Sequence, residues 1–154
     1  MLTEGDPVPD VKLVGAKGEP VSPADFGGQK LVLYFYPKDD TSGCTREAQD
    51  FTALAAEFEK CGTWILGVSK DSPESHARFT GKYGLEVKLA TDPDGSVCEA
   101  FGTWVQKSLY GRKYMGIDRA TFLIGRDGTI ARIWRKVKVP GHAEAVLAAA
   151  RELP

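Results

Sequence analysis

One apolar run limits what this chain can fold into. Residues 30–37, KLVLYFYP, are almost continuously apolar and aromatic, and Gly28 and Pro37 bound the run. Because successive side chains of a strand point to opposite faces of a sheet, an unbroken apolar run predicts a strand that is buried on both faces. The chain then continues directly into a loop and a helical pattern that carry a cysteine, Cys44.

The remaining pattern alternates between strands and helices. The first part of the chain predicts a small hairpin over residues 11–21, with its turn at Gly15 and Gly18, then a helix over 45–60 and a strand over 63–69. The middle predicts a helix over 72–84, which begins at Ser72 and ends at Gly84, a strand over 87–92, a short helix over 96–102 and a loop to Gly116. The last part predicts a hairpin over 119–137, with its turn at Asp127 and Gly128, and a helix over 141–154. This order predicts a mixed β-sheet with helices on both faces, in the arrangement of the thioredoxin-like fold.

Length and composition favour one soluble domain over residues 1–154. The chain has no internal repeat, no linker and no apolar run of 18 residues, and its first residues, MLTEGDPVPD, lack the basic and apolar regions of a signal peptide. A cytoplasmic location is therefore expected. A net charge of −1 favours neither a nucleic-acid nor a membrane partner. The densest basic group, in the segment 132–138, is interpreted as a solvated face.

The chain has three cysteines, Cys44, Cys61 and Cys98. This odd number does not make a secreted disulfide framework. They show no paired zinc-ligand spacing with His76 or His142. The phosphate-binding glycine motifs are also absent, since GAKGEP lacks the GK[ST] ending. We therefore expect neither a metal nor a cofactor, and each cysteine has to be judged by its own surroundings.

Cys44 is the candidate nucleophile. It follows the buried strand and lies in the first turn of the predicted helix, where unpaired backbone N–H groups and the helix dipole favour the thiolate form. Thr41, three residues earlier, can place a hydroxyl beside the sulfur, and Pro37 stiffens the entry to the loop. A C-x-x-C oxidoreductase is disfavoured because the positions three before and three after Cys44 are Thr41 and Glu47. Asp39 and Asp40 are interpreted as part of a solvated loop.

The spacing Pro37-x-x-x-Thr41-x-x-Cys44 resembles the active-site signature of the peroxiredoxins. The segments LVLYFYPKDDTSGCTREAQDF, LGVSKDSPESHARFTGKYGL, GSVCEAFGTW, YGRKYMGIDRATFLIGRDG and GHAEAVL are similar, in order, to those of the Q-type group, the bacterioferritin comigratory proteins. The resemblance covers essentially the whole chain. It implies a monomeric thiol peroxidase that reduces hydrogen peroxide and organic hydroperoxides with electrons from a thiol donor such as thioredoxin.

The same resemblance implies a role for each matching residue. Cys44 corresponds to the peroxidatic cysteine, which becomes a sulfenic acid, and Thr41 to the threonine that hydrogen-bonds the thiolate and the peroxide. Arg119, in GIDRATF, corresponds to an arginine that stabilises the thiolate and the charge on the leaving oxygen. Glu47 corresponds to a glutamate that orients this arginine, although an acid in the first turn of a helix is also favourable by itself.

One position departs from the family pattern. Many Q-type members carry a resolving cysteine five residues after the peroxidatic one, and this chain has Gln49 there. Along one continuous helix, Cys61 would lie roughly 25 Å from Cys44, too far for a disulfide. Cys61 and Cys98 are interpreted as small buried thiols. We therefore predict a one-cysteine cycle in which thioredoxin, a glutaredoxin or a low-molecular-weight thiol attacks the Cys44 sulfenic acid.

A second function uses the same chemistry. A peroxide sensor or redox-regulated holdase would form the sulfenic acid once and pass it to a partner through a mixed disulfide. Turnover separates the two hypotheses, because an enzyme consumes many equivalents of peroxide with a physiological donor.

Overall fold

The computed structural model describes residues 1–154. The strands are β1 (Leu13–Gly15), β2 (Pro20–Val21), β3 (Lys30–Phe35), β4 (Thr63–Ser69), β5 (Lys88–Thr91), β6 (Trp104–Leu109), β7 (Arg112–Ile117), β8 (Ala120–Ile124) and β9 (Ile130–Trp134). The helices are α1 (Ser42–Ala53), α2 (Ala55–Lys60), α3 (Pro73–Tyr83), α4 (Ser96–Ala100) and α5 (His142–Glu152), with a 3-10 turn at Pro23–Phe26. None of the helices is long and apolar enough to cross a membrane.

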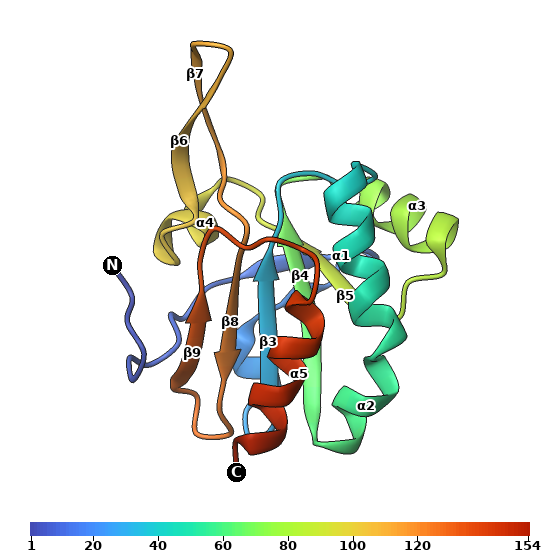
Figure 1. The fold of residues 1–154 in the computed structure, drawn as a ribbon, viewed down its shortest axis with the longest axis vertical. Helices are drawn as coiled ribbons and strands as arrows, with labels where there is room; N and C mark the ends of the chain where they lie inside the picture. Colours follow the sequence, from blue (N-terminus) through green and yellow to red (C-terminus); the bar gives the residue numbers. More distant parts are fainter.

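Seven strands form one mixed sheet in the order β2-β1-β5-β4-β3-β8-β9 (Figure 1). β3 runs parallel to β4 and antiparallel to β8, so it has a neighbour on each side. Every residue of β3 is buried, as the apolar run predicts. The mixed sheet and its central strand are therefore confirmed, and so is the N-terminal hairpin, whose strand β1 also pairs with β5.

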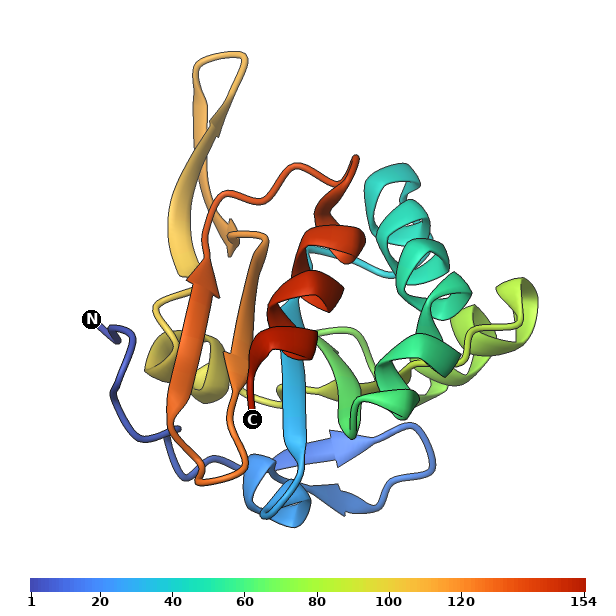
Figure 2. The same ribbon diagram turned by 60° about the horizontal axis from the view of Figure 1, so that its bottom comes forward.

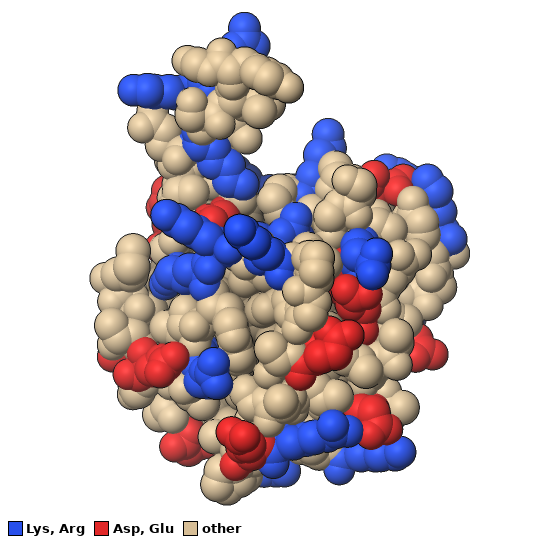
Figure 3. Space-filling view, in the orientation of Figure 1, with Lys and Arg blue, Asp and Glu red and all other residues tan.

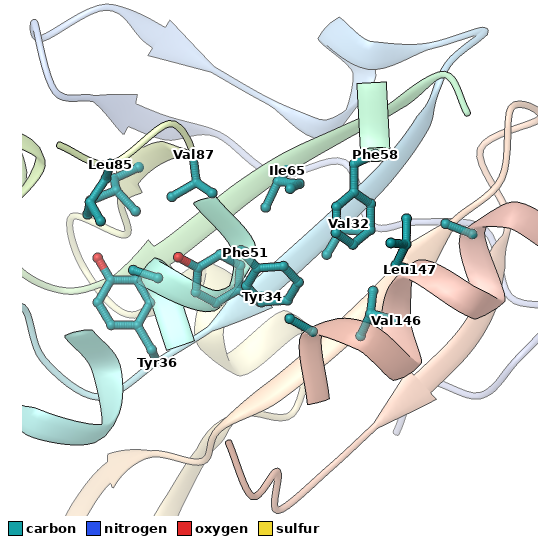
Figure 4. Close-up of a cluster of buried hydrophobic side chains, with 14 of the residues drawn as sticks. Val32, Tyr34, Tyr36, Phe51, Phe58, Ile65, Leu85, Val87, Val146 and Leu147 are labelled. Carbon is teal, nitrogen blue, oxygen red and sulfur yellow. The ribbon is translucent and has the colours of Figure 1, made fainter. Parts of the chain in front are cut away.

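The alternation of side chains along β3 divides the core into two parts. Val32, Tyr34 and Tyr36 face a cluster completed by α1, α2, α3 and α5, and Figure 4 shows how Phe51 of α1 and Val146 of α5 reach it. The intervening residues of β3 face a second cluster that contains α4 and the inner side of β8. Figure 2 shows α4 on the opposite side of the sheet from α1 and α5. The two clusters therefore share β3 and lie against its two faces.

The predicted ends of α3 are confirmed in detail. The Ser72 hydroxyl accepts a hydrogen bond from the Ser75 N–H at 3.1 Å, which satisfies one of the free donors of the first turn. Gly84 adopts the left-handed conformation that ends the helix, with φ 59°. The β8–β9 hairpin and the C-terminal helix α5 also lie where the pattern predicts them.

Two predicted segments differ from the structure. The predicted helix over 45–60 is two helices, α1 and α2, separated at Leu54 (φ −102°, ψ 4°), and the stretch contains no Gly or Pro that could have signalled the break. The predicted loop up to Gly116 is instead the antiparallel pair β6–β7, which projects from the body (Figure 1). Its turn residues Tyr110 and Gly111 both have positive φ, the geometry of a two-residue hairpin turn.

Candidate active site

The end of β3 and the start of α1 together determine the position of Cys44. The strand ends at Phe35, a short loop follows, and α1 begins at Ser42, so the sulfur lies in the first turn of the helix as predicted. Thr45 N–H donates to the Thr41 carbonyl at 2.8 Å, the first backbone bond of the helix. Cys44 belongs to the first core cluster, which also contains residues of α5, and it is only 2% exposed. The thiol is therefore held at a helix start and shielded from water.

Strand register brings Arg119 to the same place. Phe35, the last residue of β3, pairs with Ala120, the first residue of β8, so position 119 lies beside the loop that follows β3. Arg119 Nη2 donates to Cys44 Sγ at 3.4 Å, and Nη1 donates to Glu47 Oε1 at 2.7 Å. One guanidinium therefore bridges the thiol and the carboxylate, as a planar group with several fixed donors can.

Burial and ion pairing act against each other on the carboxyl of Glu47, which is 1% exposed. Burial raises the pKa of Glu47 to about 7, although the charge and hydrogen bond of Arg119 work to lower it. Its Oε2 is buried and has no hydrogen-bond partner, so only one carboxylate oxygen is stabilised. Glu47 therefore changes its charge close to neutral pH.

Arg119 keeps its charge in spite of its own partial burial. Burial opposes the charged form, but Glu47 and the Cys44 sulfur outweigh it, and together they raise the pKa of Arg119 above its ordinary value. Its side chain is 16% exposed. The site therefore contains a permanent positive charge at hydrogen-bond distance from the sulfur.

Gly43 makes room for this contact, and nothing in the sequence pattern singles it out. A Cβ added at Gly43 would lie 3.2 Å from Arg119 Nη2, closer than ordinary van der Waals contact. Its backbone is that of α1, so no unusual φ requires a glycine there. The missing side chain is explained by the close approach of the guanidinium to the first turn of the helix.

Thr41 and Pro37 lie in the loop, but the predicted contact of Thr41 with the sulfur is not among its hydrogen bonds. The Thr41 hydroxyl donates to the Lys38 carbonyl at 2.8 Å. Because that proton is used, the oxygen keeps its lone pairs free and can accept a hydrogen bond from a hydroxyl brought to the site. Pro37 is exposed where the chain leaves β3. Both residues are near the helix start, as the sequence predicts.

The interpretation of Asp39 as a solvated loop residue is wrong. Asp39 is 7% exposed, and its carboxylate accepts hydrogen bonds from the Tyr36 hydroxyl and, at 2.8 Å, from the Ser75 hydroxyl. His76 Nδ1 lies 2.8 Å from Asp39 Oδ2, and the ring of His76 is fully buried. A buried carboxylate with three partners anchors the active-site loop to the start of α3.

Asp40 anchors the loop at the other end of α3. It is more exposed than Asp39, yet its carboxylate accepts hydrogen bonds from Lys82 Nζ at 2.8 Å and from the Tyr83 hydroxyl. Asp40 has φ 58°, a left-handed conformation that aspartate tolerates better than most residues. The two consecutive aspartates therefore fasten the loop that carries Thr41 to both ends of one helix.

The other two thiols lie away from this site. Cys98 is fully buried in the second cluster, on the opposite face of the sheet from Cys44. Burial raises the pKa of Cys98 to about 12, and the nearby Asp92 adds to this effect. Cys61 follows α2, and its thiol donates to the Phe58 carbonyl at 3.3 Å. Gln49, which occupies the position of the resolving cysteine in the family pattern, is on the exposed face of α1.

The two histidines have different hydrogen-bond partners. His142 Nε2 lies 2.8 Å from the Thr121 hydroxyl, and burial, assisted by Arg119, lowers the pKa of His142 to about 4. His142 is therefore neutral at physiological pH. No three His, Cys, Asp or Glu side chains come together in a group that could hold a metal ion.

The whole chain is similar to known proteins. Residues 4–133 match the AhpC/TSA family. The chain is 52% identical over 122 residues to peroxiredoxin Bcp of Xanthomonas campestris, covering 79% of this chain and 76% of that one. It is 43% identical over 149 residues to peroxiredoxin Bcp of Bacillus subtilis, covering 97% and 95%. A solved structure of the Xanthomonas campestris bacterioferritin comigratory protein, described in connection with alkyl peroxide reduction, superposes with a TM-score of 0.90 at 44% identity, covering 97% and 98%.

Proposed function

Because the chain belongs to the Q-type, or bacterioferritin comigratory protein, peroxiredoxins of the AhpC/TSA family, we propose that Cys44 is its peroxidatic cysteine and that the catalytic cycle uses this one cysteine. The chain is thus a thiol peroxidase, with a peroxide as substrate and a thiol as reductant. The observation that carries the assignment of the site is the bond from Arg119 Nη2 to Cys44 Sγ at 3.4 Å. No other cysteine has a cation at hydrogen-bond distance.

The first step is a displacement at oxygen. The Cys44 thiolate attacks the terminal oxygen of ROOH, an S–O bond forms and the O–O bond breaks. Sulfur gives up two electrons and becomes a sulfenic acid, and the leaving RO⁻ takes a proton to become an alcohol, or water when the substrate is hydrogen peroxide. The burial of Cys44 strengthens the electrostatic interactions around the reacting atoms.

The neighbouring groups each have a place in this step. Arg119 stabilises the thiolate and then the charge that develops on the leaving oxygen, and Glu47 orients the guanidinium through the 2.7 Å bond to Nη1. Thr41 accepts a hydrogen bond from the peroxide, because its own proton is donated to Lys38. Pro37 restricts the backbone where the loop leaves β3.

The second step requires a thiol from another molecule. Gln49 cannot attack the sulfenic acid, Cys98 is on the opposite face of the sheet, and Cys61 lies beyond α2. An external thiol attacks the sulfur of the sulfenic acid, which releases water and leaves a mixed disulfide with Cys44. A second thiol of the donor then restores Cys44 and leaves as a disulfide. Thioredoxin, a glutaredoxin or a low-molecular-weight thiol has the chemistry to do this. We also propose that the protein acts as a monomer.

Three serine variants test the proposal. Cys44→Ser should abolish peroxide consumption with every donor, whereas Cys61→Ser and Cys98→Ser should form the sulfenic acid in a single turnover at the rate of the parent protein. The rate is followed by trapping with dimedone after one equivalent of peroxide. Peroxide consumption by Cys44→Ser would overturn the site assignment. Slow or absent turnover of the parent protein with all donors, after normal sulfenic acid formation, would favour the sensor hypothesis instead.

A further inference from the structure

The β6–β7 hairpin projects from the body without a third strand or a covering helix (Figure 1). Its base is anchored: Ile117 is buried in the second cluster, and Asp118 N–H donates to the Thr103 carbonyl at 2.7 Å. An isolated two-stranded ribbon is only marginally stable in water. The outer half of this hairpin packs against no other strand or helix of the chain, so nothing within the chain stabilises its extended form.

The outer half of the hairpin is apolar as well as exposed. Leu109 is 57% exposed, Tyr110 is fully exposed, and Tyr114 and Met115 are 44% and 49% exposed. Together with Met1 and Trp64, these four residues make up the exposed large apolar side chains of the chain. Such a concentration on one projecting element is typical of a surface that binds another protein.

The hairpin is also basic. Residues 101–117 contain Lys107, Arg112 and Lys113 and not a single acidic residue, in a chain whose net charge is −1. Figure 3 shows Lys and Arg side chains over the hairpin and over the surface at its base. Part of that base is the segment after β9, which holds the exposed Lys136 and Lys138, and Val137 N–H of this segment donates to the Arg119 carbonyl at 3.0 Å.

This basic surface adjoins the reacting sulfur. β7 runs directly into Asp118 and Arg119, and Arg119 contacts Cys44. Burial and the charge of Arg119 lower the pKa of Lys107, while Asp118 and Cys44 oppose that change, so this hairpin residue lies within electrostatic reach of the site. A molecule that brings a thiol to Cys44 has to approach the end of the sheet from which the hairpin rises (Figure 1).

We propose that the outer β6–β7 hairpin, with Lys136 and Lys138 at its base, is the docking surface for a protein thiol donor whose own thiol lies in an apolar area surrounded by acidic residues. The inference rests on the proposed external resolution of the Cys44 sulfenic acid and adds the location and the chemistry of the partner. Tyr110, Tyr114 and Met115 supply the apolar contact. The cations attract the acidic rim of the donor and raise its association rate.

The test compares two double variants with the same change in charge. Arg112→Glu/Lys113→Glu alters the outer hairpin, and Lys12→Glu/Lys17→Glu alters exposed lysines near the β1–β2 hairpin. Each is assayed with a net-negative thioredoxin kept reduced by thioredoxin reductase and NADPH, and separately with dithiothreitol. We expect the hairpin variant to lose about tenfold or more in kcat/KM for thioredoxin, with dithiothreitol turnover and single-turnover sulfenic acid formation within about twofold of the parent.

Salt and an apolar variant give independent readings. The kcat/KM of the parent for thioredoxin should fall as ionic strength rises from about 20 to about 300 mM, and the hairpin charge variant should lose most of this dependence. Tyr110→Ser/Met115→Ser, which keeps the charges, should raise the KM for thioredoxin and keep the salt dependence.

Several results would overturn the docking proposal. One is a hairpin variant that turns over thioredoxin like the parent, or no more slowly than the Lys12/Lys17 control. A second is a parent protein that turns over with dithiothreitol or glutathione but not with thioredoxin. A third is sedimentation showing that the hairpin joins two copies of the chain in an oligomer that the variant loses. Failure of the one-cysteine cycle itself has a different signature, because the unmodified protein would then form an internal disulfide without any donor.

Discussion

Arg119 donates to Cys44 Sγ across 3.4 Å, although seventy-five positions of sequence separate the two residues. The pairing of Phe35 with Ala120 brings them together, because it places the residue before β8 next to the loop after β3. The contact is therefore a product of sheet register, and each group around it is positioned by a different element.

Arg119→Lys keeps a positive charge near Cys44 but removes the planar guanidinium that donates hydrogen bonds to both Glu47 and the sulfur. We expect the rate constant for sulfenic acid formation to fall by about 10- to 100-fold, and Arg119→Met to lower it further, by about 100- to 1000-fold. Stopped-flow tryptophan fluorescence or competition with catalase measures this rate. A lysine variant as fast as the parent would show that charge alone is sufficient.

Gly43→Ala should slow the reaction with peroxide without destabilising the protein. Alanine has the higher helix propensity and would stabilise an unhindered helix position by up to about 1 kcal/mol. The added methyl group, however, would lie 3.2 Å from Arg119 Nη2 and displace the guanidinium from the sulfur. We expect unchanged or higher stability in urea denaturation together with slower reaction with peroxide. Equal rates for the variant and the parent would mean that the arginine adjusts without loss.

Glu47→Gln should change how stability depends on pH. Burial raises the pKa of Glu47 from its ordinary 4.5 to about 7, so between these values the folded protein holds a proton that the unfolded chain has released. The contribution of this group to stability is therefore fully present below pH 4.5 and is lost as pH rises to about 7. At about 1.4 kcal/mol per pH unit, the loss is about 3 kcal/mol.

Glutamine cannot titrate, so the variant should lack this decline. The measurement is the free energy of unfolding in urea at pH 4.5 and at pH 7.5 for both proteins. Between these pH values the free energy of unfolding of the parent should fall by about 3 kcal/mol more than that of the variant. At neutral pH the variant should also react more slowly with peroxide, since Arg119 loses its orienting carboxylate. Parallel stability curves would contradict the assignment of a raised pKa.

Asp39→Ala tests the attachment of the active-site loop to α3. The change removes the carboxylate that the buried Tyr36 hydroxyl and His76 Nδ1 both contact, and it leaves these two groups only their 3.3 Å contact with each other. We expect the protein to be destabilised by about 1–3 kcal/mol. Asp39→Asn can still accept from Tyr36 and donate to a neutral His76, so we expect it to retain most of the stability. The freed loop carries Thr41, and the alanine variant should therefore also react more slowly with peroxide. Urea denaturation and single-turnover kinetics of both variants measure these effects.

The parts of the fold that bury apolar side chains could be predicted from the sequence. The run at β3, the strand β4 and the capped helix α3 each have a burial period or an end signal that depends on local residues alone. Cys44 and Arg119 could be found because their motifs resemble a known family. The contact between them, however, depends on strand pairing far apart in the sequence.

The features that the sequence pattern missed share a physical reason. The β6–β7 hairpin is mostly exposed, so no alternation of apolar and polar residues marks its strands, and its turn begins with a tyrosine instead of the usual Asn, Asp or Gly. Asp39 looks like a loop residue until α3 brings Ser75 and His76 to it. Gly43 has an ordinary helical backbone, and only the position of Arg119 shows why a side chain is absent.

The most direct test of the one-cysteine cycle is the state of the protein after one equivalent of hydrogen peroxide without any thiol donor. Mass spectrometry of the intact chain, followed by peptide mapping, should show one added oxygen on Cys44, with Cys61 and Cys98 still reduced and open to alkylation under denaturing conditions. A Cys44–Cys98 or Cys44–Cys61 disulfide with no retained oxygen would contradict the account, because the chain would then contain its own resolving thiol.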